Sequence, residues 1–228
     1  MSKRKTEREA RKVIRDYGLA IGGSIFVALL IRFFLIEAYR MPSRAMQPAV
    51  EPGDTLFVSK FAYGLRVPGA TARLSDHLPA YGDVAVLEFP EEPGREYIKR
   101  IVGLPGDLVQ ITKGALVLNG KIMTQAPEGE ALCRPETLPN GRTYTVCFEP
   151  PLLSTETQIT VPPASAFVVG DLRTSPTEMS HLRIQGVVPF SGLHGRAQFV
   201  WLSIQPPTAS GGDWFSRIRF NRLFQKIH

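Results

Sequence analysis

The sequence predicts an all-β domain of coiled antiparallel sheets, preceded by one N-terminal transmembrane helix. An apolar run within residues 18–36 has about the length that crosses a bilayer. After Met41, short β-branched and aromatic runs alternate with Gly, Pro and Asn clusters, a pattern typical of many short strands. With 228 residues, 43% of them hydrophobic, the chain is long enough to bury one sizeable core.

These patterns divide the chain into four parts. We expect a cytoplasmic basic N-terminus at 1–17, a transmembrane anchor at 18–36, an extracytoplasmic β-rich domain at 37–212 and a basic amphipathic C-terminal tail at 213–228. The sequence contains no internal repeat, glycine-rich phosphate loop or low-complexity tract.

The anchor prediction rests on an apolar run at 18–35 that is interrupted only by Arg32. Lysine and arginine are concentrated before this run, so the positive-inside rule predicts a cytoplasmic N-terminus and export of the remainder. A cleavable signal peptide is the competing interpretation. The residues after the run, Glu37-Ala38-Tyr39-Arg40, offer no small-x-small cleavage site, which favours a retained anchor.

Within the exported part, we predict strands at 55–58, 84–87, 115–118, 167–169 and 197–202. Hairpin turns are predicted at Leu118-Asn119-Gly120-Lys121 and at Pro139-Asn140-Gly141, because Asn-Gly favours the tight turns that join antiparallel strands. A less regular insertion is expected around 125–160.

Two cysteines, Cys133 and Cys147, flank the second turn, and folding the chain there brings their sulfurs nearly opposite each other. This placement favours a disulfide and an oxidising compartment such as the periplasm. Two reduced thiols remain the alternative, because spacing alone does not define bond geometry.

The net charge of +6 arises mainly from basic residues at the two ends of the chain. Such ends suit an anionic membrane surface, and we expect no nucleic-acid partner because no basic stripe interleaved with aromatic residues is present. The tail is predicted either to lie on the membrane surface or to pack its apolar face against the β domain. The four scattered histidines show no metal-ligand spacing, so neither a metal nor another cofactor is expected.

Candidate chemistry is concentrated at 97–107. Strand alternation sends Tyr97, Lys99 and Ile101 to one face and Arg100 to the other, so one of the two cations points toward the apolar side. A buried lysine has a lowered pKa and can act as a general base near neutral pH. A surface lysine in a charged strand is the alternative on spacing alone.

Five blocks in this order resemble those of the bacterial type I signal peptidases. They are the polar block at 41–54, Lys60-Phe61-Ala62-Tyr63-Gly64, the lysine block at 97–107, Gly170-Asp171-Leu172-Arg173 and Gly195-Arg196-Ala197. The resemblance covers nearly the whole chain. It implies a signal peptidase-like β domain, and a Ser-Lys dyad that cleaves signal peptides from exported preproteins at the outer face of the bacterial inner membrane.

Roles for individual residues follow from this resemblance. Lys99 matches the general base, Ser43 matches the hydroxyl that assists the oxyanion hole, and the amide of residue 45 is the other donor. The resemblance also implies substrates with small residues at −1 and −3, and no cofactor. Residues expected to bind substrate or support the dyad are Met46, Tyr97, Gly170, Asp171, Arg173 and Arg183.

The sequence departs from the family at the nucleophile position, where Ala45 replaces serine. An alanine methyl group cannot form an acyl-enzyme, so catalysis is predicted to be lost. Three explanations remain open: an introduced serine-to-alanine change that traps substrate, a natural paralogue that has lost catalysis, or Ser43 acting as the nucleophile.

The late block departs as well, because it is about three residues longer than in the family. Aligning Arg183 with the last family arginine places His181 at an aspartate position and Met179 at a serine position. Support for Lys99 then depends on Ser175 or Ser180. We therefore predict an inactive signal peptidase I-like membrane serine endopeptidase. The alternatives are a non-catalytic signal-peptide-binding or regulatory paralogue, and a role at the lipid surface alone.

Overall fold

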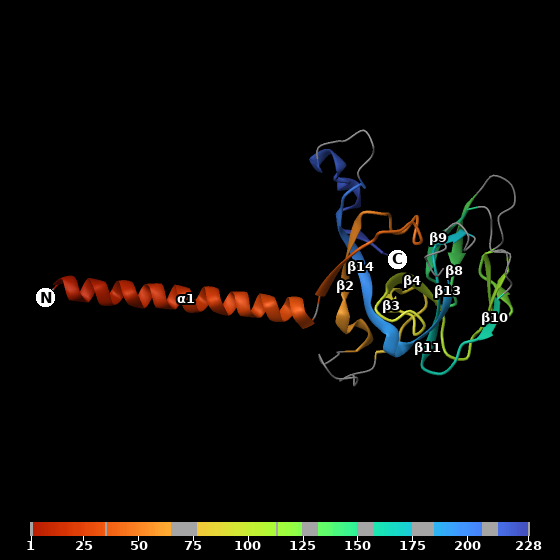
Figure 1. Ribbon diagram of the computed structural model, residues 1–228, viewed down its shortest axis with the longest axis horizontal. Coiled ribbons are helices and arrows are strands. Elements are labelled where there is room, and N and C mark those ends of the chain that lie inside the picture. Colours follow the sequence, from red (N-terminus) through yellow and green to blue (C-terminus); the bar gives the residue numbers. More distant parts are fainter. Residues whose placement is uncertain are drawn as a thin grey trace.

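The computed structural model describes residues 2–34, 36–64, 77–112, 114–124, 132–149, 157–174, 185–206 and 214–227. It consists of one long N-terminal helix and a β domain (Figure 1). The predicted positions 175–184, which include Ser175, Met179, Ser180, His181 and Arg183, lie outside the described residues.

The N-terminal helix α1 spans Ser2–Phe34 and extends away from the β domain (Figure 1). Its side chains are exposed from Lys12 to Ala28, including apolar ones such as Leu19, Ile21 and Phe26. Within the part of the chain that the structure describes, no helix combines the length and the apolar character needed to cross a membrane.

The β domain contains fifteen strands among the described residues. They are β1 Ile36–Arg40, β2 Asp54–Ser59, β3 Val84–Glu88, β4 Glu96–Gly103, β5 Leu108–Thr112, β6 Ala115–Leu118, β7 Lys121–Ile122, β8 Cys133–Thr137, β9 Thr143–Glu149, β10 Thr157–Thr160, β11 Ser165–Val169, β12 Leu172–Thr174, β13 Gln185–Pro189, β14 Leu193–Ser203 and β15 Gln225–Lys226. Short 3₁₀ turns lie at Lys60–Tyr63, Phe190–Gly192, Trp214–Arg217 and Phe220–Arg222. The predicted all-β class is confirmed, and each predicted strand lies in an observed one.

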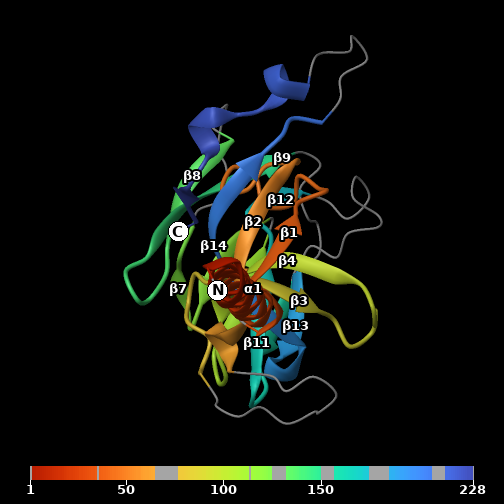
Figure 2. The same ribbon diagram turned by 90° about the vertical axis from the view of Figure 1, so that its left-hand side faces the viewer.

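The strands form three sheets. The main sheet has the order β1-β2-β14-β3-β4-β11-β13, with β15 also paired to β14; the smaller sheets are β10-β5-β6-β7 and β12-β9-β8. Register shifts along β14 bend this strand, so it pairs with β2 on one side and with β3 and then β15 on the other (Figure 1). Figure 2, viewed along α1, shows the main sheet on the side of the domain that the helix joins.

Two sequence expectations change in detail. The sheets are antiparallel as predicted except for one pair, β12 and β9, which runs parallel, with β12 on the edge of β9 opposite β8. The insertion expected to be less regular around 125–160 contains this regular β8–β9 hairpin at its described centre.

Both predicted hairpin turns are present. Asn119 and Gly120 have φ angles of 51° and 77°, as a two-residue type I′ turn between β6 and β7 requires. In the β8–β9 hairpin, Cys133 lies directly opposite Cys147, and the two sulfurs are joined in a disulfide.

The C-terminal tail packs with its charged side inward. Arg219 and Arg222 donate hydrogen bonds to acidic and carbonyl groups at 49–54, whereas Trp214 and Phe220 are exposed. Apolar residues of the tail contact the β domain as well: Ile227 packs against the buried cluster that contains Met46, and the Phe224 ring centroid lies 6.1 Å from that of Phe199. Buried carboxylates supply the partners that draw the arginines inward.

Candidate active site

The loop at 41–54 is closed by backbone hydrogen bonds between its ends. The Met41 amide donates to the Asp54 carbonyl at 2.7 Å, and the Gly53 amide donates to the Met41 carbonyl at 2.9 Å. Gly53 has a φ of +89°, and a Cβ at this position would lie 2.0 Å from the Ile204 carbonyl oxygen, so only glycine fits. The closed loop holds Ser43 and Ala45 in a compact turn.

Ala45 and Met46 are part of the hydrophobic core, not of the surface. Met46 is fully buried and Ala45 is 4% exposed, in a cluster with Val84 and Ile98. Ser43 is half-buried at the edge of the same turn. The position of residue 45 is thus fixed by the side chains packed around it.

Strand β4 is buried on both faces, and it buries both of its cations. Lys99 is 1% exposed and Arg100 is not exposed at all. On the Lys99 face, Tyr97 and Ile101 join an apolar cluster that includes Val168. The sequence predicted that one of the two cations points toward the apolar side, and the structure buries both.

Burial controls the protonation of Lys99. Loss of solvation lowers the pKa of its ammonium group to about 8, and the nearby negative charge of Asp171 opposes this change. An amine with this pKa is partly neutral at neutral pH, as a general base requires. Among the described residues, Lys99 therefore has the protonation behaviour expected of the base in a Ser-Lys dyad.

The turn at Gly170 brings Lys99 and Ala45 together. A Cβ built on Gly170 would lie 2.6 Å from the Ala45 carbonyl oxygen and 3.5 Å from Lys99 Nζ. The Leu172 amide donates a hydrogen bond to the same Ala45 carbonyl at 3.2 Å. Glycine at 170 is required by this close approach, which packs the loop with residue 45 against the buried amine.

Asp171 neutralises the second buried cation of β4. Its carboxylate accepts two hydrogen bonds from Arg100, at 2.7 and 2.6 Å, and both side chains are fully buried. The Arg100 guanidinium also donates to the Gly82 carbonyl and lies 3.9 Å from the centroid of the Tyr144 ring. Burial raises the pKa of the Asp171 carboxyl, and the Arg100 guanidinium counteracts that rise.

Arg173 makes a second buried ion pair beside the first. It donates to Glu136 at 2.8 Å, to the Gly114 carbonyl at 2.7 Å and to the Gly170 carbonyl at 2.8 Å. Its bond to Gly170 fixes the carbonyl of the turn that faces Ala45. Sequence analysis predicted Arg173 but missed Glu136, because an isolated glutamate in an insertion carries no motif.

The disulfide hairpin is attached to the same turn. The Cys147 amide donates to the Asp171 carbonyl at 2.9 Å, so β9 directly supports the residue that pairs with Arg100. Cys133 and Cys147 therefore act as structural residues near the site. Arg183, the remaining predicted support residue, lies outside the described residues.

Lys99 and the loop that carries Ala45 thus meet at the Gly170 turn. A neutral lysine amine can remove a proton from a neighbouring hydroxyl, but Ala45 presents only a methyl group.

Comparison with known proteins identifies the class to which this fold and site belong. The family described as signal peptidase, peptidase S26, matches residues 14–202, so the chain belongs to that family.

Individual relatives indicate the type of signal peptidase. Signal peptidase I of Pseudomonas aeruginosa is 33% identical over 89% of this chain and 78% of its own length. Signal peptidase I of Rickettsia akari is 27% identical over 98% of this chain and 97% of its own length. A crystal structure of a signal peptidase I from Enterococcus faecalis matches 54% of this chain and 98% of that chain, with 22% identity and a TM-score of 0.34. The sequence matches place the chain among the type I signal peptidases.

Proposed function

We propose that this chain binds the signal peptides of exported preproteins and, with alanine at position 45, does not cleave them. The observation that carries the proposal is the packing of Ala45 against the turn that also meets Lys99 Nζ. Membership of the signal peptidase family supplies the substrate class, with small residues at −1 and −3 as the resemblance implies.

The loss of activity follows from the mechanism. Without an attacking oxygen no acyl-enzyme forms, and removal of a catalytic nucleophile costs on the order of a million-fold in rate. Binding is affected much less, because the walls around residue 45 remain packed: Met46 and Ile98 lie in the same buried cluster.

Ser43 is the competing nucleophile. It lies two residues from position 45, and a shift of that length displaces the attacking oxygen by several Å, on the order of two Cα–Cα steps. We assign Ser43 instead to oxyanion stabilisation.

The test compares four full-length chains in detergent with one preprotein. The unchanged chain is expected not to cleave the preprotein, and Ala45→Ser is expected to restore cleavage. Adding Lys99→Ala to Ala45→Ser is expected to abolish the restored activity, because the base is removed. Ser43→Ala in the otherwise unchanged chain tests whether Ser43 is the nucleophile. If the unchanged chain cleaves the preprotein and Ser43→Ala does not, Ser43 is assigned as the nucleophile.

Binding is measured separately from turnover. The unchanged chain is expected to bind a fluorescent signal peptide, and a matched peptide with a bulky residue at −1 should bind at least about tenfold more weakly. Equal affinity for the two peptides, or no affinity for either, would contradict the peptide-binding proposal.

We propose further that the chain is a single-pass protein of the bacterial inner membrane, with its N-terminus in the cytoplasm and its β domain outside. The apolar run at 18–35 and the exposed apolar side chains of α1 support an anchor, because such a surface requires an apolar environment. Exposed aromatic residues of the tail, Trp214 and Phe215, support a second contact with lipid.

Membrane attachment is tested with vesicles of bacterial lipid composition. The full chain is expected to float with the vesicles and to resist extraction by carbonate, and protease added outside inverted membrane vesicles should remove only the N-terminal residues. Release by carbonate would contradict an anchor, and digestion of the β domain would contradict the proposed orientation.

A further inference from the structure

A pocket of about 360 Å³ lies where the main sheet is interrupted along one edge of β14. β3 pairs with the first part of β14, up to Arg196, and β15 pairs with Phe199 and Val200. Between them, the ends of β3 and β15 leave space over Ala197 and Gln198. The pocket is therefore a gap between two strands that share one neighbour.

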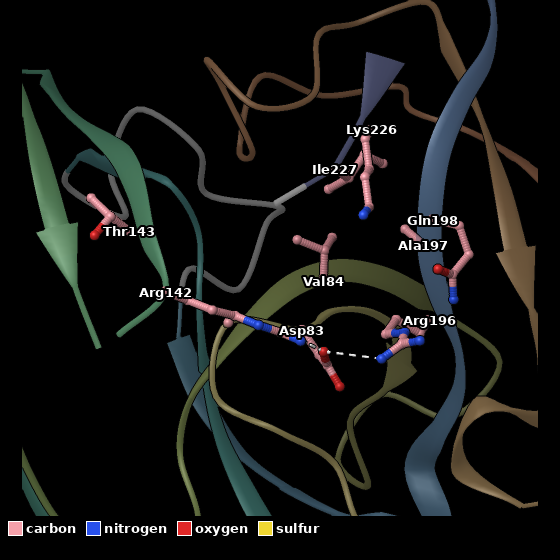
Figure 3. Close-up of a pocket in the computed structure, with 10 residues that line it drawn as sticks. Asp83, Val84, Arg142, Thr143, Arg196, Ala197, Gln198, Lys226 and Ile227 are labelled. Atoms are coloured by element: carbon pink, nitrogen blue, oxygen red, sulfur yellow. Dashed lines mark hydrogen bonds and ion pairs between the residues drawn. The ribbon is translucent and has the colours of Figure 1, made fainter. Parts of the chain in front are cut away.

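Three cations reach this gap from separate elements. Arg142 comes from the end of the β8–β9 turn, Arg196 from β14 and Lys226 from β15 (Figure 3). Figure 3 shows the Lys226 side chain extending from β15 toward the two arginines. The lining includes a single acidic residue, Asp83, so three cations and one carboxylate leave a net charge of +2.

Asp83 holds the arginines in place and does not occupy the opening. Its side chain is 3% exposed and accepts hydrogen bonds from Arg142 at 2.7 Å and from Arg196 at 3.5 Å. The two arginine side chains themselves remain 46% and 38% exposed. The carboxylate thus lies below the pocket surface and orients two guanidinium groups that still face outward.

We propose that this pocket binds a phosphate group. Converging donors on three elements match the oxygens of a tetrahedral anion, and arginine forks bind phosphate through paired N–H groups. A net charge of +2 attracts an anion into the pocket. The proposal goes beyond signal-peptide binding, because none of the three cations belongs to the site around Lys99.

Two sources carry this chemistry, a soluble phosphate compound and the headgroup of an anionic phospholipid. The first probe is inorganic phosphate, titrated by calorimetry into the full chain in zwitterionic detergent at constant ionic strength, with acetate as the comparison anion. Phosphate is expected to bind, and acetate is expected to bind at least about fivefold more weakly because its two coplanar oxygens cannot meet donors from three separate elements.

Two variants locate the binding. Arg142→Gln and Lys226→Gln are each expected to weaken phosphate binding at least about fivefold, since each removes one charge-assisted hydrogen bond. Lys226 is exposed on a two-residue strand, so its variant keeps the fold even where Arg142→Gln disturbs it. Lys121→Gln, an exposed lysine on β7, is the matched control and should bind phosphate like the unchanged chain.

Vesicles with and without phosphatidylglycerol distinguish the sources. Weaker binding of Lys226→Gln to the anionic vesicles, with competition by phosphate, assigns the pocket to a headgroup. Unchanged vesicle binding together with weakened phosphate binding assigns it to a soluble compound. Equal binding of acetate and phosphate, or pocket variants that bind phosphate like Lys121→Gln, would overturn the proposal.

Discussion

At the scale of single residues, the proposed Ser-Lys dyad needs two properties that depend on different residues: a lysine with a lowered pKa and a nucleophilic oxygen. Burial gives Lys99 its lowered pKa, and this depends on β4 and its neighbours, not on residue 45. The nucleophile depends on one oxygen atom at residue 45 alone. In the proposed function, alanine at position 45 therefore removes the attacking oxygen without changing the burial that lowers the pKa of Lys99.

The pH dependence of a restored enzyme follows from Lys99. In Ala45→Ser, kcat/KM for preprotein cleavage is expected to rise about tenfold per pH unit below about 8 and to level off above it, because only the neutral amine accepts the serine proton. Initial rates between pH 6 and 9.5 measure the profile. A rate independent of pH over this range would show that Lys99 is not the base.

Lys99 also makes stability depend on pH. Its pKa is about 8 in the folded chain and 10.5 when unfolded, so below pH 8 both states are protonated and the burial cost is present in full. Between pH 8 and 10.5 the unfolded chain binds more protons, and the free energy of unfolding rises by about 3 kcal/mol.

Lys99→Met removes this dependence. The variant is expected to be more stable than the unchanged chain at pH 7, with the advantage shrinking between pH 8 and 10.5. Urea unfolding in detergent at several pH values measures the difference. An advantage that stays constant with pH would contradict the assignment.

Only some properties of these residues could be predicted from the sequence. Strand alternation predicted that Lys99 or Arg100 points inward, because a period of two is visible in the residue pattern. It did not predict that both are buried, since burial on two faces depends on which strands and turns pack over β4. Glu136 could not be predicted, because its role exists only when the hairpin is folded against Arg173.

At the scale of elements, one buried ion pair joins the main sheet to the small β12-β9-β8 sheet, and a second lies within that small sheet. Arg100 of β4 in the main sheet binds Asp171, which precedes β12, and Arg173 of β12 binds Glu136 of β8. These pairs attach the disulfide hairpin to the strand that carries Lys99. Their positions fix the Gly170 turn against the loop with residue 45.

Asp171→Asn tests this linkage. The change leaves the Arg100 guanidinium buried without a charged partner and is expected to destabilise the chain by about 3–5 kcal/mol. The variant should also lower the pKa of Lys99, because Asp171 supplies the negative charge that opposes desolvation. Urea unfolding gives the stability, and the pH profile in an Ala45→Ser background gives the pKa.

The matched control is Glu149→Gln. Glu149 pairs with Arg44 at 3.2 Å, but both side chains are substantially exposed, so the loss is expected to be about 0–1 kcal/mol. A loss for Asp171→Asn as small as that of the control would contradict a buried, interdependent pair.

Strand positions were predictable where β-branched runs end at Gly, Pro or Asn, as at β3, β6 and β11. Strand order was not predictable, because it depends on long-range pairing. The bends of β14, and with them its pairing to β2, β3 and β15, come from register shifts that no local residue pattern marks. The parallel pairing of β12 with β9 also depends on residues that lie far apart in the sequence.

At the scale of the whole molecule, the last segment of the chain supports the loop that carries residue 45. Asp54 closes this loop and is fully buried, where it accepts hydrogen bonds from Arg222 at 2.6 Å and from Ser203 at 2.7 Å. Arg222 also donates to the Ala49 carbonyl at 3.2 Å. The beginning and the end of the β domain are thus joined by the buried ion pair between Asp54 and Arg222.

Arg222→Gln is expected to destabilise the full chain by about 3–5 kcal/mol, because Asp54 remains buried and loses its closest cation. In an Ala45→Ser background, the same change should lower kcat for preprotein cleavage, since the loop that positions the nucleophile is no longer held at Ala49.

Arg217→Gln is the control. Arg217 belongs to the same tail and donates to the exposed Gln205 carbonyl, so its variant should change stability by less than about 1 kcal/mol. If the two variants unfold at the same urea concentration, Arg222 does not support the loop, and the other partners of Asp54, which include Arg219, Ser203 and the Glu51 amide, are sufficient to hold its carboxylate.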